Sequence, residues 1–521
     1  MIGLRAVRPL GWIAVFLPVA ALAQAVPKAT CSKSDRPESG LQGETTQAEV
    51  DSGANKNGFK CNADLVGQVQ GEGASWQLAA WKNCAYYDQA NNSSHLQQPG
   101  TVVVDVSDPT HPVITDHLTD VSMIDPWESL KVNAKRQLLG GAQQPGPGLA
   151  IYDISGDCRH PVLKSSVNIP GSRGHAGQWA PDGNTYYVTT IINKPSLVAV
   201  DTTDTANPKV LLQWTPPAGT NPIFHDVEFS KDGNTAYMTA IGGFANQPAG
   251  TNGLLILDVS DIQSRKASPN IRLIGSVSWD DGSLIAQNAL PITIAGKPYI
   301  LFTDEVGPQI LGKATAQQYC AAGKSVNGFP RMIDISDPTK PVVVSKLQSE
   351  MSDVAHCSQA LSGIATTGTT PFGAGNPIFG HSCHYCNVDD ADNATLAACS
   401  CFSAGMRFFD IRDVKNPKEV AYYKPPAQGT KSIPGSQYSI FAGAGFNRPV
   451  DWAPAKPSFP KDRGMTSGDV WFTTQDNGFQ VAKLNVNLHS GSGCGSIGGA
   501  GASALLGLLA SLRRRRRVQA G

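Results

Sequence analysis

Short stretches of apolar and β-branched residues that end in aspartate recur six times along the chain. They read VVVD, AIYD, VAVD, LILD, RMID and RFFD, and they occupy residues 102–105, 150–153, 198–201, 255–258, 331–334 and 407–410. Runs of this length and composition, bounded by turn residues, predict short strands that are buried on both faces.

Each of these stretches runs into a polar turn. A second aspartate follows three residues later in five copies, and a proline follows seven residues after the first aspartate in four: Asp108, Asp204, Asp261, Asp337 and Asp413, and Pro112, Pro208, Pro341 and Pro417. Aspartate side chains accept hydrogen bonds from the backbone of their own turn. Proline removes a ladder donor, which only an edge strand tolerates. The strand after each turn is therefore predicted to be an outer edge.

The other half of the repeat begins with histidine. HAGQWAPDGNTYYVTT from His175 and HDVEFSKDGNTAYMTA from His225 align without a gap, and the segment from His384 keeps the asparagine nine residues after its histidine. The DGN and ADN turns contain residues that accept a positive φ, as a two-strand hairpin requires. Each repeat thus holds four strands: a histidine-led strand, its hairpin partner, the strand that ends in aspartate, and a proline-led edge strand.

Four-stranded units of this length bury both faces only by stacking on one another. We therefore predict an all-β fold, a β-propeller of about seven four-stranded blades over residues 75–488. A last unit, DVWFTTQDNGFQVAKLNV from Asp469, has Lys483 where the aspartate belongs, as expected of a closing blade. The polar segment 26–74 precedes the propeller, and its first part, to about residue 60, is interpreted as a leader or a closing strand.

The VVVDVSDP and MIDISDP segments resemble the LVIVD repeat, a propeller family of exported and surface proteins. The resemblance covers most of residues 75–488. It implies a propeller and extracellular display, and it carries no single reaction. The copies centred on Asp153 and Asp201 depart from the SDP turn.

Both ends of the chain carry targeting features. Arg5 and Arg8 precede an apolar run over 10–22, and Ala21 and Ala23 form an A-x-A pattern, so residues 1–25 are predicted to be a secretory signal peptide. The alternative, a short membrane anchor, fits less well because the run is too short. Export makes disulfides the first interpretation of the cysteines.

Ten of the eleven cysteines lie in the body of the chain, an even number: Cys31, Cys61, Cys84, Cys158, Cys320, Cys357, Cys383, Cys386, Cys399 and Cys401. The last four are close enough in sequence to suit either a zinc site or two disulfides. An oxidising compartment favours the disulfides.

The C-terminal segment 489–521 combines a Gly/Ser spacer containing Cys494, a short apolar run over 497–512 and five arginines over 513–517. The run falls short of the ~20 residues that a bilayer core requires, and the arginines favour the cytoplasmic side. This order resembles the MYXO-CTERM and GlyGly-CTERM sorting tails of exported Gram-negative proteins. The resemblance implies cleavage by a membrane protease, display at the cell surface or outer membrane, and a processing or attachment role for Cys494. A plain single-span anchor is the alternative.

The composition and the absence of certain motifs argue against several classes of function. The 521 residues include 42 Lys and Arg against 42 Asp and Glu, so no basic excess predicts nucleic-acid binding. The sequence contains no phosphate-binding Gly-rich loop and no nucleophile elbow.

His175, His225 and His384 share one phase of the repeat, at the strand that lines the channel of a propeller. Three neutral imidazoles at a channel mouth suit a transition metal ion and leave a position open for water or substrate. His356 and His381 lie close in sequence and are further candidates, while another blade offers Asn288. The alternative is that each histidine orders a loop and that duplication copied it. The sequence identifies no carboxylate partner.

Two classes of function follow. The first, which the sequence favours, is a surface-anchored propeller that binds an unknown protein or glycan and acts as an adhesion or interaction scaffold. The second is a metal-dependent enzyme, of which an oxidoreductase is one form, with the three histidines at its channel.

Overall fold

The computed structural model describes residues 25–89, 97–190, 197–216, 223–241, 252–362, 379–426, 456–459, 469–475 and 477–486. The chain divides into one compact unit over Met1–Val486 and a second over Asn487–Gly521. The predicted signal peptide, up to residue 24, and the predicted sorting tail with Cys494 lie outside the described residues.

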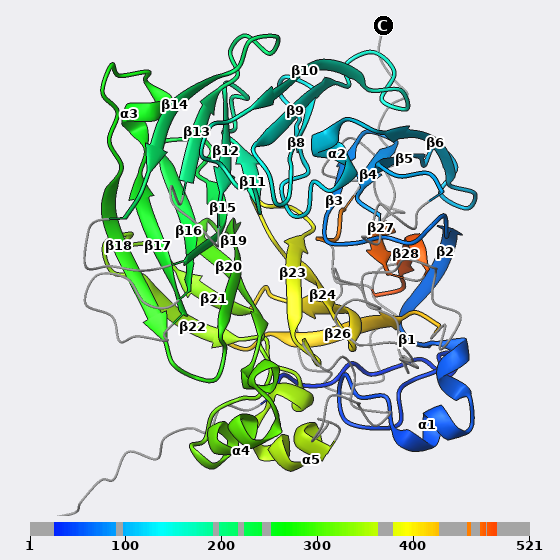
Figure 1. The fold of residues 1–521 in the computed structure, drawn as a ribbon. Helices are drawn as coiled ribbons and strands as arrows, with labels where there is room; N and C mark the ends of the chain where they lie inside the picture. Colours follow the sequence, from blue (N-terminus) through cyan, green and yellow to red (C-terminus); the bar gives the residue numbers. More distant parts are fainter. Residues whose placement is uncertain are drawn as a thin grey trace, which may run out of the picture. The chain divides into compact units, whose positions relative to one another are not determined.

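In the described part of the chain, the strands form seven antiparallel sheets, which are the blades of a propeller (Figure 1). Blade 1 contains β3 (Leu78–Trp81), β4 (Cys84–Tyr87), β5 (Thr101–Asp105) and β6 (Val113–Leu118). Blade 2 contains β7 (Lys131–Asn133), β8 (Leu138–Ala142), β9 (Gly148–Asp153) and β10 (Val162–Asn168). Blade 3 contains β11 (Gly177–Trp179), β12 (Thr185–Thr189), β13 (Leu197–Asp201) and β14 (Lys209–Trp214).

Blades 4 and 5 repeat this order of strands. Blade 4 contains β15 (Ile223–Phe229), β16 (Thr235–Ile241), β17 (Asn252–Asp258) and β18 (Arg272–Trp279). Blade 5 contains β19 (Ile285–Ile294), β20 (Lys297–Val306), β21 (Arg331–Asp334) and β22 (Val342–Lys346). The all-β propeller predicted from the repeats is thus confirmed.

Blades 6 and 7 are completed by strands from the N-terminal segment. Blade 6 contains β23 (Cys383–Val388), β24 (Leu396–Cys401), β25 (Gly405–Asp410), β26 (Lys418–Lys424) and, outside them, β1 (Phe59–Cys61). Blade 7 contains β27 (Asp469–Thr474), β28 (Gly478–Leu484) and β2 (Ala63–Val69), and Ser458 pairs with Trp471 on the inner side of β27. Because β2 pairs with β28, the start of the chain closes the ring.

The repeated aspartate turns have the expected geometry. The first aspartate accepts the backbone N–H two residues later in all six copies, as Asp105 does from Ser107 at 2.9 Å. The following strands β6, β14 and β22 are outer edges, as predicted. The prediction is wrong for β26, which pairs with β1 through residues 422–424. Pro417 precedes that register, so its missing N–H leaves the pairing intact.

The hydrophobic core lies between neighbouring blades. Separate clusters of buried residues join blade 7 to 1, 1 to 2, 2 to 3, 3 to 4, 4 to 5 and 5 to 6. Between blades 6 and 7, the rings of Tyr423 and Phe472 are 5.8 Å apart. Each sheet therefore buries both faces against its neighbours, as the radial arrangement requires.

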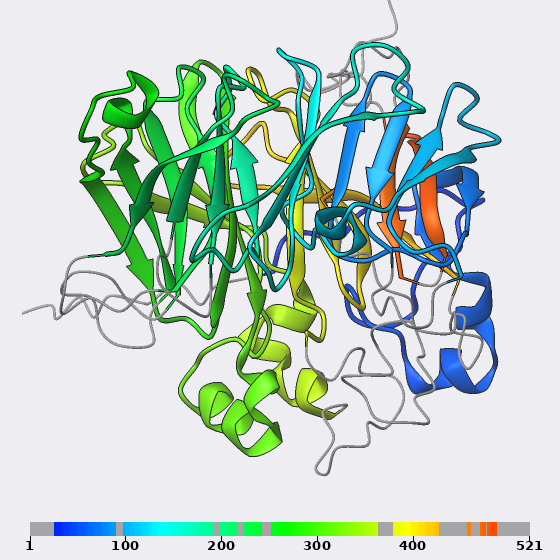
Figure 2. The same ribbon diagram turned by 45° about the horizontal axis from the view of Figure 1, so that its top comes forward.

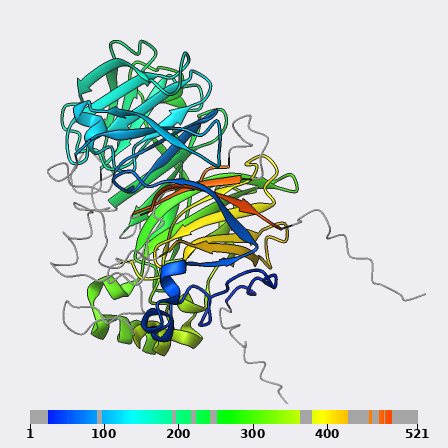
Figure 3. The ribbon, with the colours of Figure 1, turned by 90° about the vertical axis from the view of Figure 1, so that its right-hand side faces the viewer.

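Short helices lie in the segments outside the blade strands. They are α1 (Gln47–Asp51), η1 (Ala54–Asn57), α2 (Val121–Ile124), α3 (Ser260–Gln263), η2 (Pro308–Leu311), α4 (Lys313–Ala321), η3 (Glu350–Ser352), η4 (Val354–His356) and α5 (Cys357–Ser362). Helices α1, α4 and α5 lie on the same side of the propeller in all three views (Figures 1, 2 and 3). Among the described residues, none of the helices is long and apolar enough to cross a membrane.

Five disulfides hold the described part of the chain: Cys31–Cys61, Cys84–Cys158, Cys320–Cys357, Cys383–Cys401 and Cys386–Cys399. The last two cross between β23 and β24, so disulfides, and not a zinc site, account for these four cysteines. This many disulfides indicates an extracellular or otherwise oxidising environment.

Candidate metal centre

Five ionisable side chains from five blades meet at the centre of the ring. Glu128 and His175 precede the inner strands of blades 2 and 3, where residue 128 pairs with residue 176. His225 and His384 lie on the inner strands β15 and β23, and Glu305 lies on β20. All five are buried, with no more than 6% of any residue exposed. The shared repeat phase of the three histidines thus corresponds to a shared position in space.

The polar atoms of this cluster are close together. The Nε2 atoms of His175 and His225 are 3.0 Å apart, and His175 Nε2 is 3.4 Å from Glu128 Oε2. His384 Nε2 is 2.9 Å from Glu128 Oε1 and 3.4 Å from Glu305 Oε1. His225 Nε2 is 3.9 Å from Glu305 Oε2. Glu128 therefore bridges the pair His175/His225 and the pair His384/Glu305.

Neighbouring charges set the protonation of the cluster. Burial disfavours an ionised Glu128, but the surrounding imidazoles outweigh it and hold its pKa well below the usual range. Burial also disfavours the imidazolium of His384, but Glu305 and Glu128 outweigh it and raise the pKa of His384 to about 10. Burial lowers the pKa of His225 to about 3 and raises that of Glu305. The two carboxylates thus favour a positive charge between them.

The spacing fits metal binding in two overlapping groups of side chains that share Glu128. Atoms bound to the same ion at about 2.0–2.1 Å are separated by about 2.9–3.4 Å. Glu128, His175 and His225 offer one ligand atom each within 4.8 Å of one another, and so do Glu128, Glu305 and His384. A mixed set of imidazole and carboxylate suits first-row divalent ions such as Zn²⁺, Fe²⁺, Mn²⁺ and Cu²⁺.

Aromatic rings enclose the cluster. The ring of Trp76 lies 5.5 Å from that of His384, and the ring of Trp127 lies 5.8 Å from that of His175. The two indoles are 4.9 Å apart, and Phe402 packs against His384 at 5.3 Å. These rings cover His175 and His384, and the burial of the cluster strengthens the charge interactions within it.

A second polar layer lies on the same inner strands. Asp226 accepts from Asn288 Nδ2 at 3.0 Å and from the Tyr385 hydroxyl at 3.3 Å. Glu228 accepts from Lys456 Nζ at 2.8 Å and from Gln178 Nε2 at 2.8 Å. Asn288 therefore supports the carboxylates of Asp226 and Glu228 through its amide nitrogen.

Sequence reasoning placed some members of the cluster and missed others. His356 and His381 belong to neither group of potential ligands. Glu128 was missed, although a signal for it exists. The repeat aspartates Asp105, Asp153 and Asp201 are 48 residues apart, and the position 48 residues before His175 is residue 127, next to Glu128. Glu305 carries no such signal because it lies on the second strand of its blade.

Comparison with known proteins supports the repeat. The model of the LVIVD repeat matches residues 97–119 and 330–348, which span β5 with β6 and β21 with β22. None of the curated proteins compared with the chain matches it. Fold and repeat together define a seven-bladed β-propeller that contains LVIVD repeats.

Solved structures similar to the chain are distant. The β-propeller domain of Cps50 (Swd1) from Myceliophteria thermophila is 10% identical with a TM-score of 0.48, and the match covers 81% of this chain and 99% of that one. A protein from Lactobacillus plantarum is 14% identical with a TM-score of 0.41, covering 67% and 85%. The periplasmic gluconolactonase of Pseudomonas aeruginosa is 13% identical with a TM-score of 0.35, covering 51% and 67%.

Proposed function

We propose that this protein is an exported metalloprotein that binds one first-row transition metal ion at the hub of the propeller and uses it in a reaction on a small molecule. The observation that carries the proposal is the convergence of His175, His225 and His384 with Glu128 and Glu305. Five buried ionisable groups from five blades are costly to assemble unless they are paired or bind a cation.

The ligand set also bears on the chemistry. Three imidazoles with one or two carboxylates are borderline ligands that accept redox-active and redox-inert metals alike. A catalytic site keeps one coordination position for water or substrate, and the indoles of Trp76 and Trp127 would shield that position from bulk solvent. A metal-dependent enzyme is therefore favoured over a plain scaffold.

Surface display belongs to the same proposal. The five disulfides fit an exported protein, and the tail 489–521 supports attachment to a Gram-negative cell surface through processing at Cys494. A binding or adhesion role toward a protein or glycan is compatible with this placement. Such a role would use the loops at the ends of the blades, which are separate from the buried hub. Its support is the architecture alone.

Metal analysis of the purified full chain tests the proposal. We expect about one equivalent of a first-row metal per chain, because a single cluster offers the ligands. The His225→Ala and Glu305→Gln variants should lose most of it. The His111→Ala variant, which changes a histidine whose side chain is 83% exposed, should retain it. Wild-type protein that stays metal-free after incubation with zinc, manganese, iron and copper salts would overturn the proposal.

A further inference from the structure

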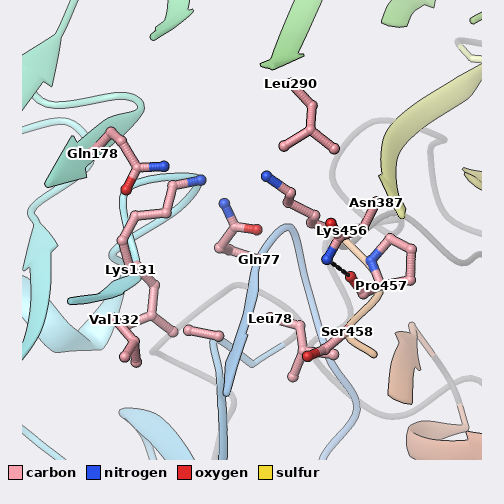
Figure 4. Close-up of a pocket in the computed structure, with 12 residues that line it drawn as sticks. Gln77, Leu78, Lys131, Val132, Gln178, Leu290, Asn387, Lys456, Pro457 and Ser458 are labelled. Atoms are coloured by element: carbon pink, nitrogen blue, oxygen red, sulfur yellow. Dashed lines mark hydrogen bonds between the residues drawn. The ribbon is translucent and has the colours of Figure 1, made fainter. Parts of the chain in front are cut away.

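A cavity of about 220 Å³ lies among the inner strands of the propeller (Figure 4). Gln77 lies beside β3, Lys131 on β7, Gln178 on β11 and Asn387 on β23, and Ser458 pairs with β27. At about 30 Å³ for each water of the liquid, the space equals roughly seven waters. It is the size of a small organic molecule.

The cavity contains an ammonium group for which the described part of the chain provides no hydrogen-bond acceptor. Lys131 is 7% exposed, and its Nζ makes no hydrogen bond to the described residues. The ring centre of Tyr385 lies 5.5 Å from this nitrogen, and the buried carboxylates of Asp226 and Glu228 also attract it. Figure 4 shows its side chain extending toward the same space as those of Gln77 and Gln178. A buried cation without an acceptor is costly, so an anionic ligand would stabilise it.

Two further polar atoms at the cavity are unsatisfied. Gln77 Oε1 and Ser458 Oγ are buried and have no hydrogen-bond partner among the described residues. The other lysine at the cavity, Lys456, is already paired with Glu228 at 2.8 Å. Among the lining residues that the structure describes, the groups without a partner are therefore one ammonium, one carbonyl acceptor and one hydroxyl.

We propose that this cavity binds a small hydroxylated carboxylate, whose carboxylate accepts from Lys131 and whose hydroxyl group bonds to Gln77 and Ser458. Leu78, Leu130 and Leu290 line the rest of the cavity and suit a short aliphatic segment. Gln77 also donates from Nε2 to the carbonyl oxygen of Glu128 at 3.0 Å, which connects the cavity to the metal cluster. The assignment of this ligand class as the substrate rests on the proposed function, whereas anion binding does not.

Calorimetric titration of the metal-loaded full chain with lactate tests the inference. Propane-1,2-diol, in which a hydroxymethyl group replaces the carboxylate, is the neutral control. We expect lactate to bind and the diol not to bind. The Lys131→Met variant should weaken lactate binding by roughly tenfold or more, the loss of one charge-assisted hydrogen bond. The Lys135→Met variant changes an exposed lysine on the same hairpin and should bind as wild type does.

The outcomes separate the two proposals. Equal binding of lactate and the diol, or unchanged binding in Lys131→Met, would overturn the carboxylate site. A Lys131→Gln variant, with its melting curve recorded, distinguishes lost binding from lost folding. Metal content is measured on the same samples: metal retained without lactate binding contradicts only the cavity inference, and lactate binding without metal contradicts only the metal proposal.

Discussion

Buried histidines of this protein differ in charge because their neighbours differ. His384 faces two carboxylates, which raise its pKa to about 10. His381, only three residues earlier, is equally buried, but the charges near it are the cations Lys424 and Arg407. Burial first, and then these cations, lower the pKa of His381 to about 3. Sequence position alone therefore does not determine the protonation of an imidazole.

The low pKa of His381 predicts a pH dependence of stability. An unfolded histidine has a pKa of about 6.5, so below that pH the unfolded chain binds a proton that folded His381 rejects until about pH 3. The folded state therefore has its full stability, as far as His381 is concerned, above pH 6.5 and loses stability as the pH falls toward 3. Denaturant unfolding of wild type and His381→Leu at pH 4–6 should show a smaller decline in the variant, by about 1.4 kcal/mol per pH unit. The control is His160→Leu, at an exposed site. If both variants changed the pH dependence of the unfolding free energy equally, this assignment would be contradicted.

At the scale of elements, the aspartate turn of one blade contacts the outer strand of the blade before it. In β2 and β18, Gly67 and Gly275 approach the carbonyl oxygens of Pro109 and Pro338 so closely that an added Cβ would lie about 2 Å from them. In β6 the Thr115 hydroxyl donates to the carbonyl of Arg159 at 3.1 Å, again in the turn of the next blade. The repeated turn thus has two roles: it reverses the chain, and it joins neighbouring blades.

This contact predicts a specific sensitivity of the closing strand. Gly67→Ala would place a methyl group against the backbone oxygen of Pro109, about 2.1 Å away, which neither strand can relieve without shifting. We expect a loss of about 1–3 kcal/mol in unfolding free energy, typical of overpacking. Gly156→Ala is the matched control, because nothing lies within 4 Å of its added Cβ. Equal stability of the two variants in denaturant titrations would show that β2 does not depend on this contact.

At the scale of the whole molecule, periodicity predicted the ring and only part of its centre. The aspartate strands and the hairpins repeat often enough to determine four strands per blade, and the blade interfaces confirm the stacking. The closing strand was placed before about residue 60, and the role of β2 at Ala63–Val69 was missed, because ADLVGQV has no partner that is visible in the sequence. The same limit applies to Glu305, which reaches the hub from a second strand and so shares no phase with the histidines.

The most direct test of the account is X-ray absorption of the metal-loaded full chain, compared with a His384→Gln variant. The account predicts nitrogen and oxygen ligands at about 2.0–2.2 Å with scattering from about three imidazoles in the wild type, and fewer imidazoles in the variant. A metal environment without imidazole scattering, or one that His384→Gln leaves unchanged, would contradict the claim that the hub of this propeller is a metal centre.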